Sequence, residues 1–519
     1  METRENKAEI ELKLAVPPEE LAKLARDKRL RALAGAGPRP KRLVTTYFDT
    51  PDRRLMAAEL ALRVRRVGRR RIQTLKTAGH PELGPLARGE WEREIVGERP
   101  VLDAAWLSEI DDRNARRLLA KPKIGARLEP LFSTDFTRRI WRVRRAGSIV
   151  ELAIDRGRIE GPDGTSPISE VELELKSGDP AVLYGIAREI ARMVPAVVET
   201  RSKAERGYAL GNPARAGVRM GNFGIDRSTS VETAFRTVGR VCMAHTRANE
   251  MLVRDNPGVE GVHQLRVGLR RMRSALSAFR DVLPEEQRRA RTEELRWIAT
   301  SCGAARDWDV FRTQLLKPLA RYVDDEPALK RVTKAADLAR ARAYGQMCEV
   351  LASRRMTDSL LEIEEWWEGA SWGPTMGEWR EASVREFARV VLRRLNRKVS
   401  RLGSNLTELS EAQLHELRIR CKKLRYAAEF FRNAFVRKTA DAYVSALADV
   451  QDHLGSLNDA VVARQLLGEL ANRARSLPAP VLARADGIVT GWIAARVRHD
   501  LEKLPEVWAK FAARRPFWK

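Results

Sequence analysis

Cysteine and long apolar segments are scarce in this 519-residue chain. Its four cysteines, Cys242, Cys302, Cys348 and Cys421, are widely spaced and form no CxxC pair, so neither a disulfide framework nor a cysteine-ligated metal is indicated. No apolar run approaches the roughly 20 residues that cross a bilayer, and the polar start METRENKAEIELK lacks the core of a signal peptide. We therefore expect a cytoplasmic protein with no membrane partner, and exclude the integral-membrane and secreted classes.

Acidic residues are outnumbered by basic ones, 70 to 96, which gives a formal net charge of +26. An excess of this size predicts a polyanionic partner, such as nucleic acid, anionic lipid or a phosphate polymer. Charge alone leaves all three open. Hydrophobic residues make up 44% of the chain, enough for a folded protein, and the length favours about three domains.

A glycine-rich segment at residues 211–224 divides the chain and predicts a linker. Before it, short segments alternate between apolar and polar residues, which is typical of strands, with helices expected near 102–119 and 180–193. We predict an α+β domain over residues 1–210, dominated by antiparallel strands. After the linker the apolar period changes to 3.6, which predicts an all-α domain over residues 225–519.

The helical half contains an internal repeat at an offset of 152 residues. His263, Arg266 and Phe279 recur as His415, Arg418 and Phe431, and the surrounding residues follow the same register without a gap. A repeat of this length predicts two homologous helical bundles, at about residues 225–375 and 376–519.

Charged residues of one sign alternate along several of the predicted strands. Glu9, Glu11 and Lys13 share one face of the segment EIELKL, and any single strand of this kind is compatible with a solvated outer face. Other strands are wholly acidic or wholly basic on that face: they carry Glu170, Glu172 and Glu174, Glu90 and Glu92, or Arg63 and Arg65. This segregation predicts a barrel with charge inside and apolar residues outside.

Such an interior would suit a polyphosphate chain. Carboxylates on two strands can supply oxygen ligands to Mg²⁺ or Mn²⁺, while arginine and lysine neutralise phosphate oxygens. A divalent ion that bridges phosphoryl groups supports hydrolysis of a phosphoanhydride bond.

The first half resembles a CYTH domain, the triphosphate tunnel metalloenzyme family, whose mark is E-x-E-x-K on the first strand. The resemblance covers residues 1–210 and follows a fixed order of motifs: Glu9-x-Glu11-x-Lys13, LRVR, TLK, RGEWE, TDFTR, ELAID, ISEVELELKSG and SKAERGY. It implies a closed eight-stranded antiparallel β tunnel with flanking helices, a Mg²⁺ or Mn²⁺ cofactor and a triphosphate-containing substrate.

The resemblance also implies roles for individual residues. Glu9 and Glu11, with Lys13 and Lys76, are expected to be catalytic. The expected metal ligands are Glu9, Glu11, Glu170 and Glu172, with Asp155 and Glu174 as further candidates, and the expected phosphate clamps are Lys13, Arg63, Arg65, Lys76, Arg138 and Lys203. Because Arg139 follows Arg138 directly, the sequence leaves open which of the two faces the interior.

Basic residues form one stripe on a predicted helix in each repeat. His263, Arg266, Arg270 and Arg273 fall within an arc of about 80° at 100° per residue. The second repeat carries the same stripe, and one more arginine follows near each: His415, Arg418, Lys422 and Arg425, then Arg280 and Arg432. No aromatic or amide side chain is interleaved, so we expect base-blind binding to a phosphate polymer and no specific reading of nucleic acid.

This half resembles a CHAD domain, the conserved histidine α-helical domain, found fused to CYTH domains. The resemblance implies two four-helix bundles related by pseudo-twofold symmetry and binding of long-chain inorganic polyphosphate in a basic groove. Asp307 and Asp459, at equivalent positions of the two repeats, are expected to pack helices or to orient arginines.

Together these patterns predict a divalent-metal-dependent triphosphatase that hydrolyses inorganic triphosphate or a related triphosphate, joined to a polyphosphate-binding module. A cytoplasmic location associated with polyphosphate granules would fit. Two alternatives stay open: a CYTH-type adenylate cyclase, and a non-enzymatic polyphosphate- or nucleic-acid-binding scaffold.

Overall fold

The computed structural model describes residues 8–35, 37–79, 87–211, 217–323, 326–473 and 478–519. It divides into two compact units. The first comprises Met1–Arg215 together with Ala352–Ala370, and the second comprises Ala216–Leu351 together with Ser371–Lys519. Of the predicted linker, residues 217–224 contain neither helix nor strand.

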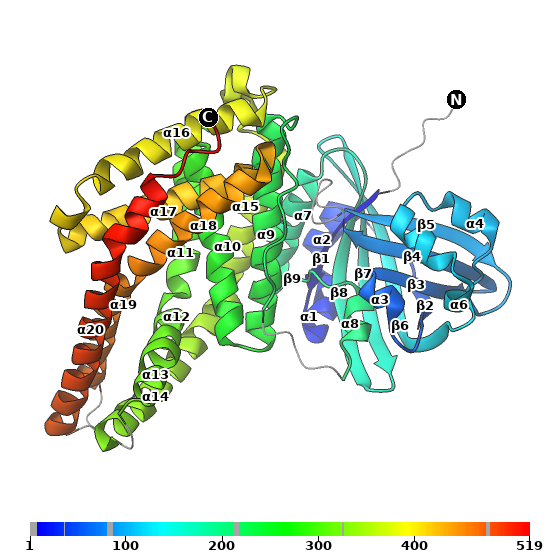
Figure 1. Ribbon diagram of the computed structural model, residues 1–519. Helices are drawn as coiled ribbons and strands as arrows, with labels where there is room; N and C mark the ends of the chain where they lie inside the picture. The colour runs from blue at the N-terminus through cyan, green and yellow to red at the C-terminus, as the bar shows by residue number, and fades with distance from the viewer. Residues whose placement is uncertain (1–7, 36, 80–86, 212–216, 324–325, 474–477) are drawn as a thin grey trace. The chain divides into compact units, whose positions relative to one another are not determined.

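Among the described residues, the first unit is built on a nine-stranded antiparallel sheet with the order β5-β4-β3-β2-β6-β7-β8-β1-β9 (Figure 1). Alternation of apolar and charged residues forms these strands, because it gives each strand one face for each environment. The strands are β1 (Ala8–Ala15), β2 (Lys41–Asp49), β3 (Leu60–Val67), β4 (Arg70–Gly79), β5 (Ala87–Ile95), β6 (Glu129–Arg145), β7 (Ser148–Gly161), β8 (Gly164–Ser177) and β9 (Val197–Val198).

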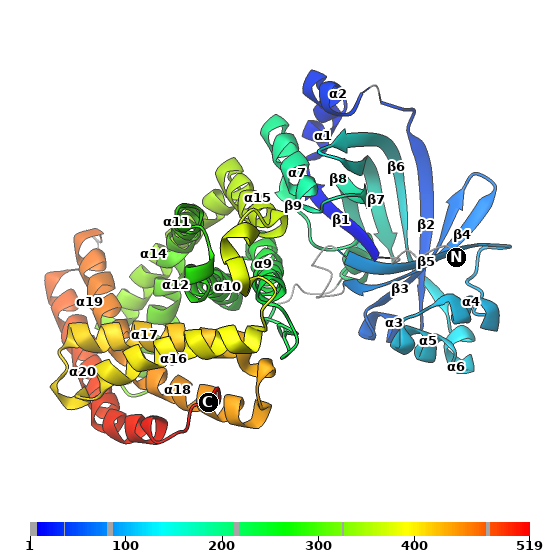
Figure 2. The same ribbon diagram turned by 90° about the horizontal axis from the view of Figure 1, so that it is seen from above.

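The sheet curls until β1 also pairs with β5, as Figure 2 shows from above. Among the described residues this seam comprises three residue pairs, from Ala8↔Gly89 to Ile10↔Ala87. The expected closed eight-stranded tunnel therefore differs in two details. The sheet has a ninth strand, the two-residue β9 beside β1, and it is not closed along its full length. A two-residue strand is too short to leave a periodic pattern in the sequence.

Helices cover the outer, apolar face of the sheet in two groups (Figure 2). One apolar core lies between β1, β6, β7 and β8 and the helices α1, α2 and α7; another lies between β3 to β5 and α3 to α6. Because apolar side chains need the outer face, the charged side chains of the same strands point inward. The helices of this part are α1 (Pro18–Leu24), α2 (Lys28–Ala34), α3 (Arg54–Ala57), α4 (Ala104–Glu109), α5 (Arg113–Leu119), α6 (Pro122–Gly125), α7 (Ala181–Met193) and α8 (Lys203–Tyr208).

A helix from far along the chain completes this unit. Helix α15 (Arg354–Gly369) packs on α7, and its Leu361 is fully buried in the core that includes Leu183 and Ile186. Thr357 donates a hydrogen bond to the carbonyl of Ala196 (3.0 Å). By sequence, α15 lies within the first predicted repeat of the helical half, at residues 225–375, yet it is grouped with the sheet.

The second unit is helical, as predicted, and its helices recur in the order of the repeat. Its α-helices are α9 (Val231–Asp255), α10 (Val259–Ala278), α11 (Glu285–Ser301), α12 (Gly303–Val310), α13 (Lys317–Leu319), α14 (Pro327–Leu351), α16 (Val384–Gly403), α17 (Glu411–Phe431), α18 (Arg437–His453), α19 (Gly455–Arg473) and α20 (Ala479–Ala512). Short 3₁₀ or π segments lie between them: η1 (Arg280–Val282), η2 (Phe311–Leu316), η3 (Gly373–Trp379), η4 (Leu406–Glu408) and η5 (Arg432–Ala434).

Helices α10, α11, α12 and α14 each begin 152 residues before α17, α18, α19 and α20, and α9 begins 153 residues before α16. Within the described residues, each repeat therefore has five matched helices, one more than a four-helix bundle. The extra helix arises because Cys302 alone separates α11 from α12, and Leu454 alone separates α18 from α19. A one-residue break does not interrupt the apolar period, so the sequence reads as one helix. Among the described residues, no helix is long and apolar enough to cross a membrane.

Candidate functional site

Strand register places the predicted charged residues side by side on the inner face of the curled sheet. Lys13 on β1 lies opposite Glu172 on β8, and Glu11 lies opposite Glu174. On the next strand, Asp155 of β7 lies opposite Glu170. Residues that face each other across paired strands have side chains on the same face, so these strands together present a continuous charged surface.

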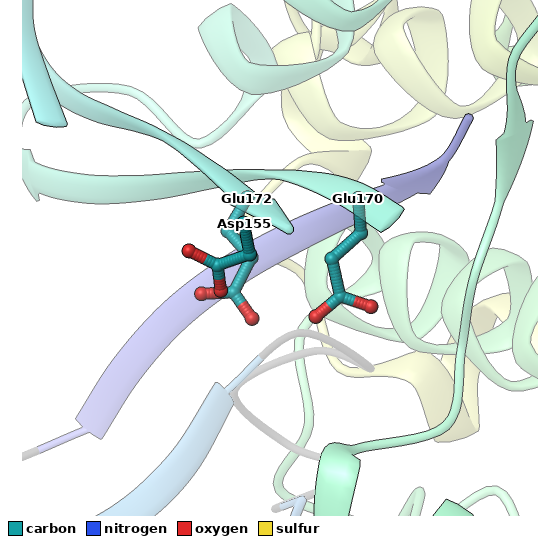
Figure 3. Close-up of side chains that lie close together, drawn as sticks. All are labelled: Asp155, Glu170 and Glu172. Carbon is teal, nitrogen blue, oxygen red and sulfur yellow. The ribbon is translucent and has the colours of Figure 1, made fainter. Parts of the chain in front are cut away.

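Three carboxylates converge on this face, from Asp155, Glu170 and Glu172 (Figure 3). Each offers one oxygen, and these oxygens all lie within 4.8 Å of one another. Asp155 is fully buried, and Glu170 is 1% exposed. We call these three residues the acidic trio. Glu170 and Glu172 are predicted ligands, whereas Asp155 was only a further candidate.

Three cations of the chain hold the acidic trio. Lys203 Nζ lies 2.8 Å from Asp155 Oδ2 and 2.7 Å from Glu172 Oε1, and it also contacts Glu170. Arg138 contacts Asp155 through two nitrogens, at 2.8 and 2.7 Å, and also contacts Glu172. Arg206 lies 3.0 Å from the other oxygen of Glu170. Burial alone would raise the pKa of Glu172, but Arg138 and then Lys203 hold it well below its usual range.

A second cluster of alternating charge lies around the first strand. Lys76 Nζ is 2.5 Å from Glu9 Oε2 and 3.2 Å from Glu90 Oε1. Arg63 approaches Glu90 at 3.3 Å and Glu92 at 3.8 Å. The structure thus links Glu9, Lys76 and Arg63 through shared ion pairs, with Glu90 between Lys76 and Arg63. It adds Glu90, which the motif RGEWE contains but which the sequence did not assign to the site.

Glu11 lies between the two clusters. Burial, followed by the negative charge of Glu172, raises the pKa of Glu11 to about 7. Its ion pair in the structure, with Lys13 Nζ at 3.8 Å, is long. A partly buried carboxylate with little compensating charge would gain from a nearby cation.

The residues present suit a hard divalent cation. The acidic trio offers three oxygens at close range, and Glu11 is a further, partly buried carboxylate beside Glu172. Mg²⁺ and Mn²⁺ are bound by carboxylate oxygens of this kind, with water completing the shell. Of the predicted ligands, Glu170 and Glu172 lie in the acidic trio, whereas Glu9 is held by Lys76 outside it.

The structure also places the two remaining basic positions. Arg138 points to the inner face, whereas Arg139 lies opposite Ile154, an outward residue of the apolar core. Arg65 donates from Nε to Thr45 Oγ1 (3.2 Å) and forms no ion pair with an acid among the described residues. Burial, then the charges of Arg63 and Arg138, lower the pKa of Arg65 to about 10, so it stays charged at neutral pH. Arg206 is an interior cation that sequence reasoning did not assign.

In the second unit, the two basic stripes lie on α10 and α17, which pack against each other. Burial and then the charges of Arg418, Arg270 and Arg425 lower the pKa of Lys422 to about 7. Arg270 belongs to the first stripe and the other three residues belong to the second. The stripes therefore meet at this point.

Some predicted stripe residues lie apart. Arg280 and Arg432 lie in the short segments η1 and η5 and pair with Asp281 (3.1 Å) and Asp441 (3.6 Å). Arg306 of α12 was not predicted, although its charge, after burial, lowers the pKa of His263. The sequence does contain a signal for Arg306: the equivalent position of the second repeat holds an asparagine, so the first repeat carries an additional basic residue there.

The fold and site define a class of protein: a curled antiparallel sheet with an acidic and basic interior, followed by a duplicated helical unit with basic stripes. Residues 7–208 match the family model of the CYTH domain, and residues 238–468 match that of the CHAD domain. The chain therefore contains a CYTH domain followed by a CHAD domain.

Two relatives are similar to parts of the chain. Over 212 residues it is 32% identical to an inorganic triphosphatase of Haemophilus influenzae, a match that spans 39% of this chain and 55%, about half, of that protein. The crystal structure of the CHAD domain from the plant Ricinus communis is 29% identical, with a TM-score of 0.51, and covers 58% of this chain and 98% of that one.

Proposed function

We propose that the first unit is a divalent-metal-dependent triphosphatase that hydrolyses inorganic triphosphate, and that the second unit binds long-chain inorganic polyphosphate. The acidic trio, surrounded by cations on one interior face, carries the first part. Carboxylates alone would repel a triphosphate. Basic side chains alone would bind it but would supply no oxygen ligands for a metal ion. The similarity to the triphosphatase of Haemophilus influenzae supports the same reaction class.

The acidic trio, with Glu11 beside it, would hold the cation. When bound, a divalent ion neutralises phosphoryl oxygens and activates water for attack on phosphorus. The chain's own cations would bind the remaining phosphate oxygens. Arg65 is available for this role because no acid among the described residues pairs with it, while Arg63 and Lys76 would exchange Glu90 for phosphate. The curled sheet keeps these groups in a partly dry space, where charge-assisted contacts are stronger than in water.

Polyphosphate binding by the second unit is supported by the meeting of the two stripes. Positive groups that depress the pKa of Lys422 repel one another, and a polyanion laid across them would relieve that repulsion. Asp307 and Asp459 supply opposing charge to Arg266 and Arg418 and so suit the predicted orienting role.

One activity panel tests the enzymatic proposal. The full chain would be assayed with tripolyphosphate, ATP and thiamine triphosphate, each with Mg²⁺, with Mn²⁺ and with chelator. Metal-dependent release of phosphate from tripolyphosphate supports the proposal, and cyclic AMP with pyrophosphate from ATP would instead indicate a cyclase. Absence of any hydrolysis, together with equal binding of RNA and polyphosphate, would favour the scaffold.

A further inference from the structure

Lys203 has a position that its predicted role as a phosphate clamp does not explain. Its ammonium contacts all three carboxylates of the acidic trio, at 2.8 Å from Asp155, 2.7 Å from Glu172, and also Glu170. An ammonium has three donors and no acceptor. Nζ donates hydrogen bonds to Asp155 and Glu172 and forms an ion pair with Glu170, so the acidic trio engages the ammonium from three sides.

The ammonium and a divalent cation would compete for one place. The oxygens of the acidic trio lie within 4.8 Å of one another, and Nζ is within hydrogen-bond distance of one oxygen from each residue. A cation bound by the same oxygens would meet the ammonium at close range, where like charges in a buried site repel strongly.

Local charge supports this competition. Three carboxylates face three cations of the chain, Lys203, Arg138 and Arg206, so the cluster is balanced as it stands. Arg206 binds Glu170 through Oε2, not the Oε1 that Lys203 contacts, and also donates to Ser166 (3.1 Å), which is not part of the acidic trio. Only Lys203 contacts every member of the acidic trio among the described residues.

The elements that carry these groups differ. Asp155, Glu170 and Glu172 lie on the long paired strands β7 and β8, whereas Lys203 is the first residue of the six-residue helix α8, which follows the N-cap Ser202. A lysine side chain on four rotatable carbons can change its position without movement of the strands.

We propose that Lys203 holds the position that a divalent cation would take among the acidic trio, and that cation binding displaces its ammonium, which then becomes free for the phosphate chain. This inference rests on the proposed metal-dependent function. Lys203 would thereby couple the two binding events: without the cation the lysine is occupied by the acidic trio, and with the cation it is released toward the substrate.

Mn²⁺ binding to the full chain, measured by calorimetry without triphosphate, tests the proposal. Lys203→Met removes the competing charge and keeps the side-chain length, so this variant should bind Mn²⁺ at least about tenfold more tightly than the wild type. The gain arises because the cation no longer has to break the charge-assisted contacts between Lys203 and the acidic trio. Arg206→Met is the matched control, since it removes one positive charge from the same cluster without vacating its centre, and its gain should be smaller. Equal gains in the two variants, or no gain for Lys203→Met, overturn the proposal.

A second measurement uses the wild type and so does not depend on the folding of a variant. In protein labelled with ¹⁵N at lysine Nζ, the buried ammonium of Lys203 should give a signal protected from exchange, assigned by its absence from Lys203→Arg. Saturating Mg²⁺ should shift or remove that signal. A signal unchanged at saturating Mg²⁺ overturns the exchange alone, whereas no binding of either cation to any form overturns both the exchange and the metal-dependent function.

Discussion

Arg188 of α7 donates from Nη1 to Glu365 Oε2 of α15 at 2.8 Å, although 177 positions separate the two residues. The same guanidinium reaches Asp358 (2.9 Å) and Glu362 (3.2 Å) on that helix. One arginine thus spans two turns of α15, and beside it Leu361 is buried in the core of the sheet unit. A segment that the sequence assigns to the helical half therefore supports the fold that carries the acidic trio.

Leu361→Ala should destabilise the sheet unit. Removal of a fully buried leucine leaves a cavity, with an expected cost of about 2 to 5 kcal/mol. Hydrogen exchange of β1, β8 and α7 should report the loss. Leu338→Ala is the control, because Leu338 is 58% exposed and its truncation should leave exchange nearly unchanged. Equal protection of these elements in both variants would show that α15 is not needed by the sheet.

Arg63→Ala should lower kcat/KM for tripolyphosphate by about tenfold or more, since a lost charge-assisted contact costs roughly 1.5 to 3 kcal/mol. Arg63 is 8% exposed and points inward on β3. Arg66→Ala, an exposed arginine on the same strand, should leave kcat/KM within about twofold, as for most surface changes. Steady-state phosphate release measures both. The assignment of Arg63 fails when the two variants behave alike.

Replacement of Glu9 and Glu11 together by Gln should reduce hydrolysis at least about a hundredfold, because two charge-assisted contacts to the cation or to its neighbours are lost. Size and polarity are kept, so the circular dichroism melt should change little. Glu98→Gln, at an exposed glutamate whose side chain is 77% accessible, serves as the control. Wild-type hydrolysis by the double variant, with an unchanged Mn²⁺ dependence, would remove both residues from the site.

How much of this site the sequence predicts depends on the range of the interaction. Period-two alternation correctly placed Glu9, Lys13 and Glu172 on one face, because the pleat fixes that geometry locally. It could not choose between Arg138 and Arg139. That choice depends on the register of β6 against β7, which pairs Arg139 with the apolar Ile154 and Arg138 with Asp155. Neither partner belongs to the TDFTR motif.

Features that depend on contacts between distant parts of the chain were harder to predict from the sequence. The repeat at 152 residues predicted the helix order of the second unit, since helix period and capping are local. The docking of α15 on α7 was not predicted. The apolar residues of α15 have the same period as those of the other bundle helices, so only the tertiary contacts show which core this helix enters. Likewise, the contacts of Lys203 join the SKAERGY motif to the strands β7 and β8. The spacing of these motifs along the sequence does not indicate that they are in contact.

Charge reversal in both stripes, with Arg266→Glu and Arg418→Glu together, should weaken binding of long-chain polyphosphate at least about tenfold and reduce its salt dependence. One chain that engages both stripes should also bind much more tightly than tripolyphosphate, because the second contact is intramolecular. Arg331→Glu, at an exposed residue of α14, controls for net charge. Fluorescence anisotropy with labelled polyphosphate of two lengths measures all three. Equal affinity for long and short chains would contradict a shared groove.

Polyphosphate affinity should fall as the pH rises above 7, and Lys422 should account for much of the fall. Its pKa is lowered to about 7 by burial, then by Arg418 and Arg425 on its own helix and Arg270 on α10, with Asp459 on α19 opposing them. Below pH 7 the ammonium is already charged. Above pH 7 a bound polyanion must recruit a proton to restore it, so affinity should drop by up to about tenfold per pH unit until the pKa of the complex is reached.

The same depressed pKa has the opposite sign for folding. Between pH 7 and the usual pKa of a lysine side chain, the unfolded chain binds a proton at Lys422 that the folded chain does not. The contribution of Lys422 to the free energy of unfolding therefore rises with pH.

The variant Lys422→Arg separates the effect on binding from the effect on folding, because arginine stays charged across this pH range. Anisotropy titrations at pH 6, 7, 8 and 9 should give a steep profile for the wild type and a flatter one for Lys422→Arg. His263 does not confuse the comparison, because burial lowers its pKa from 6.5 and it is therefore neutral over the upper part of the range. Identical profiles for the two proteins would show that Lys422 does not take up the proton.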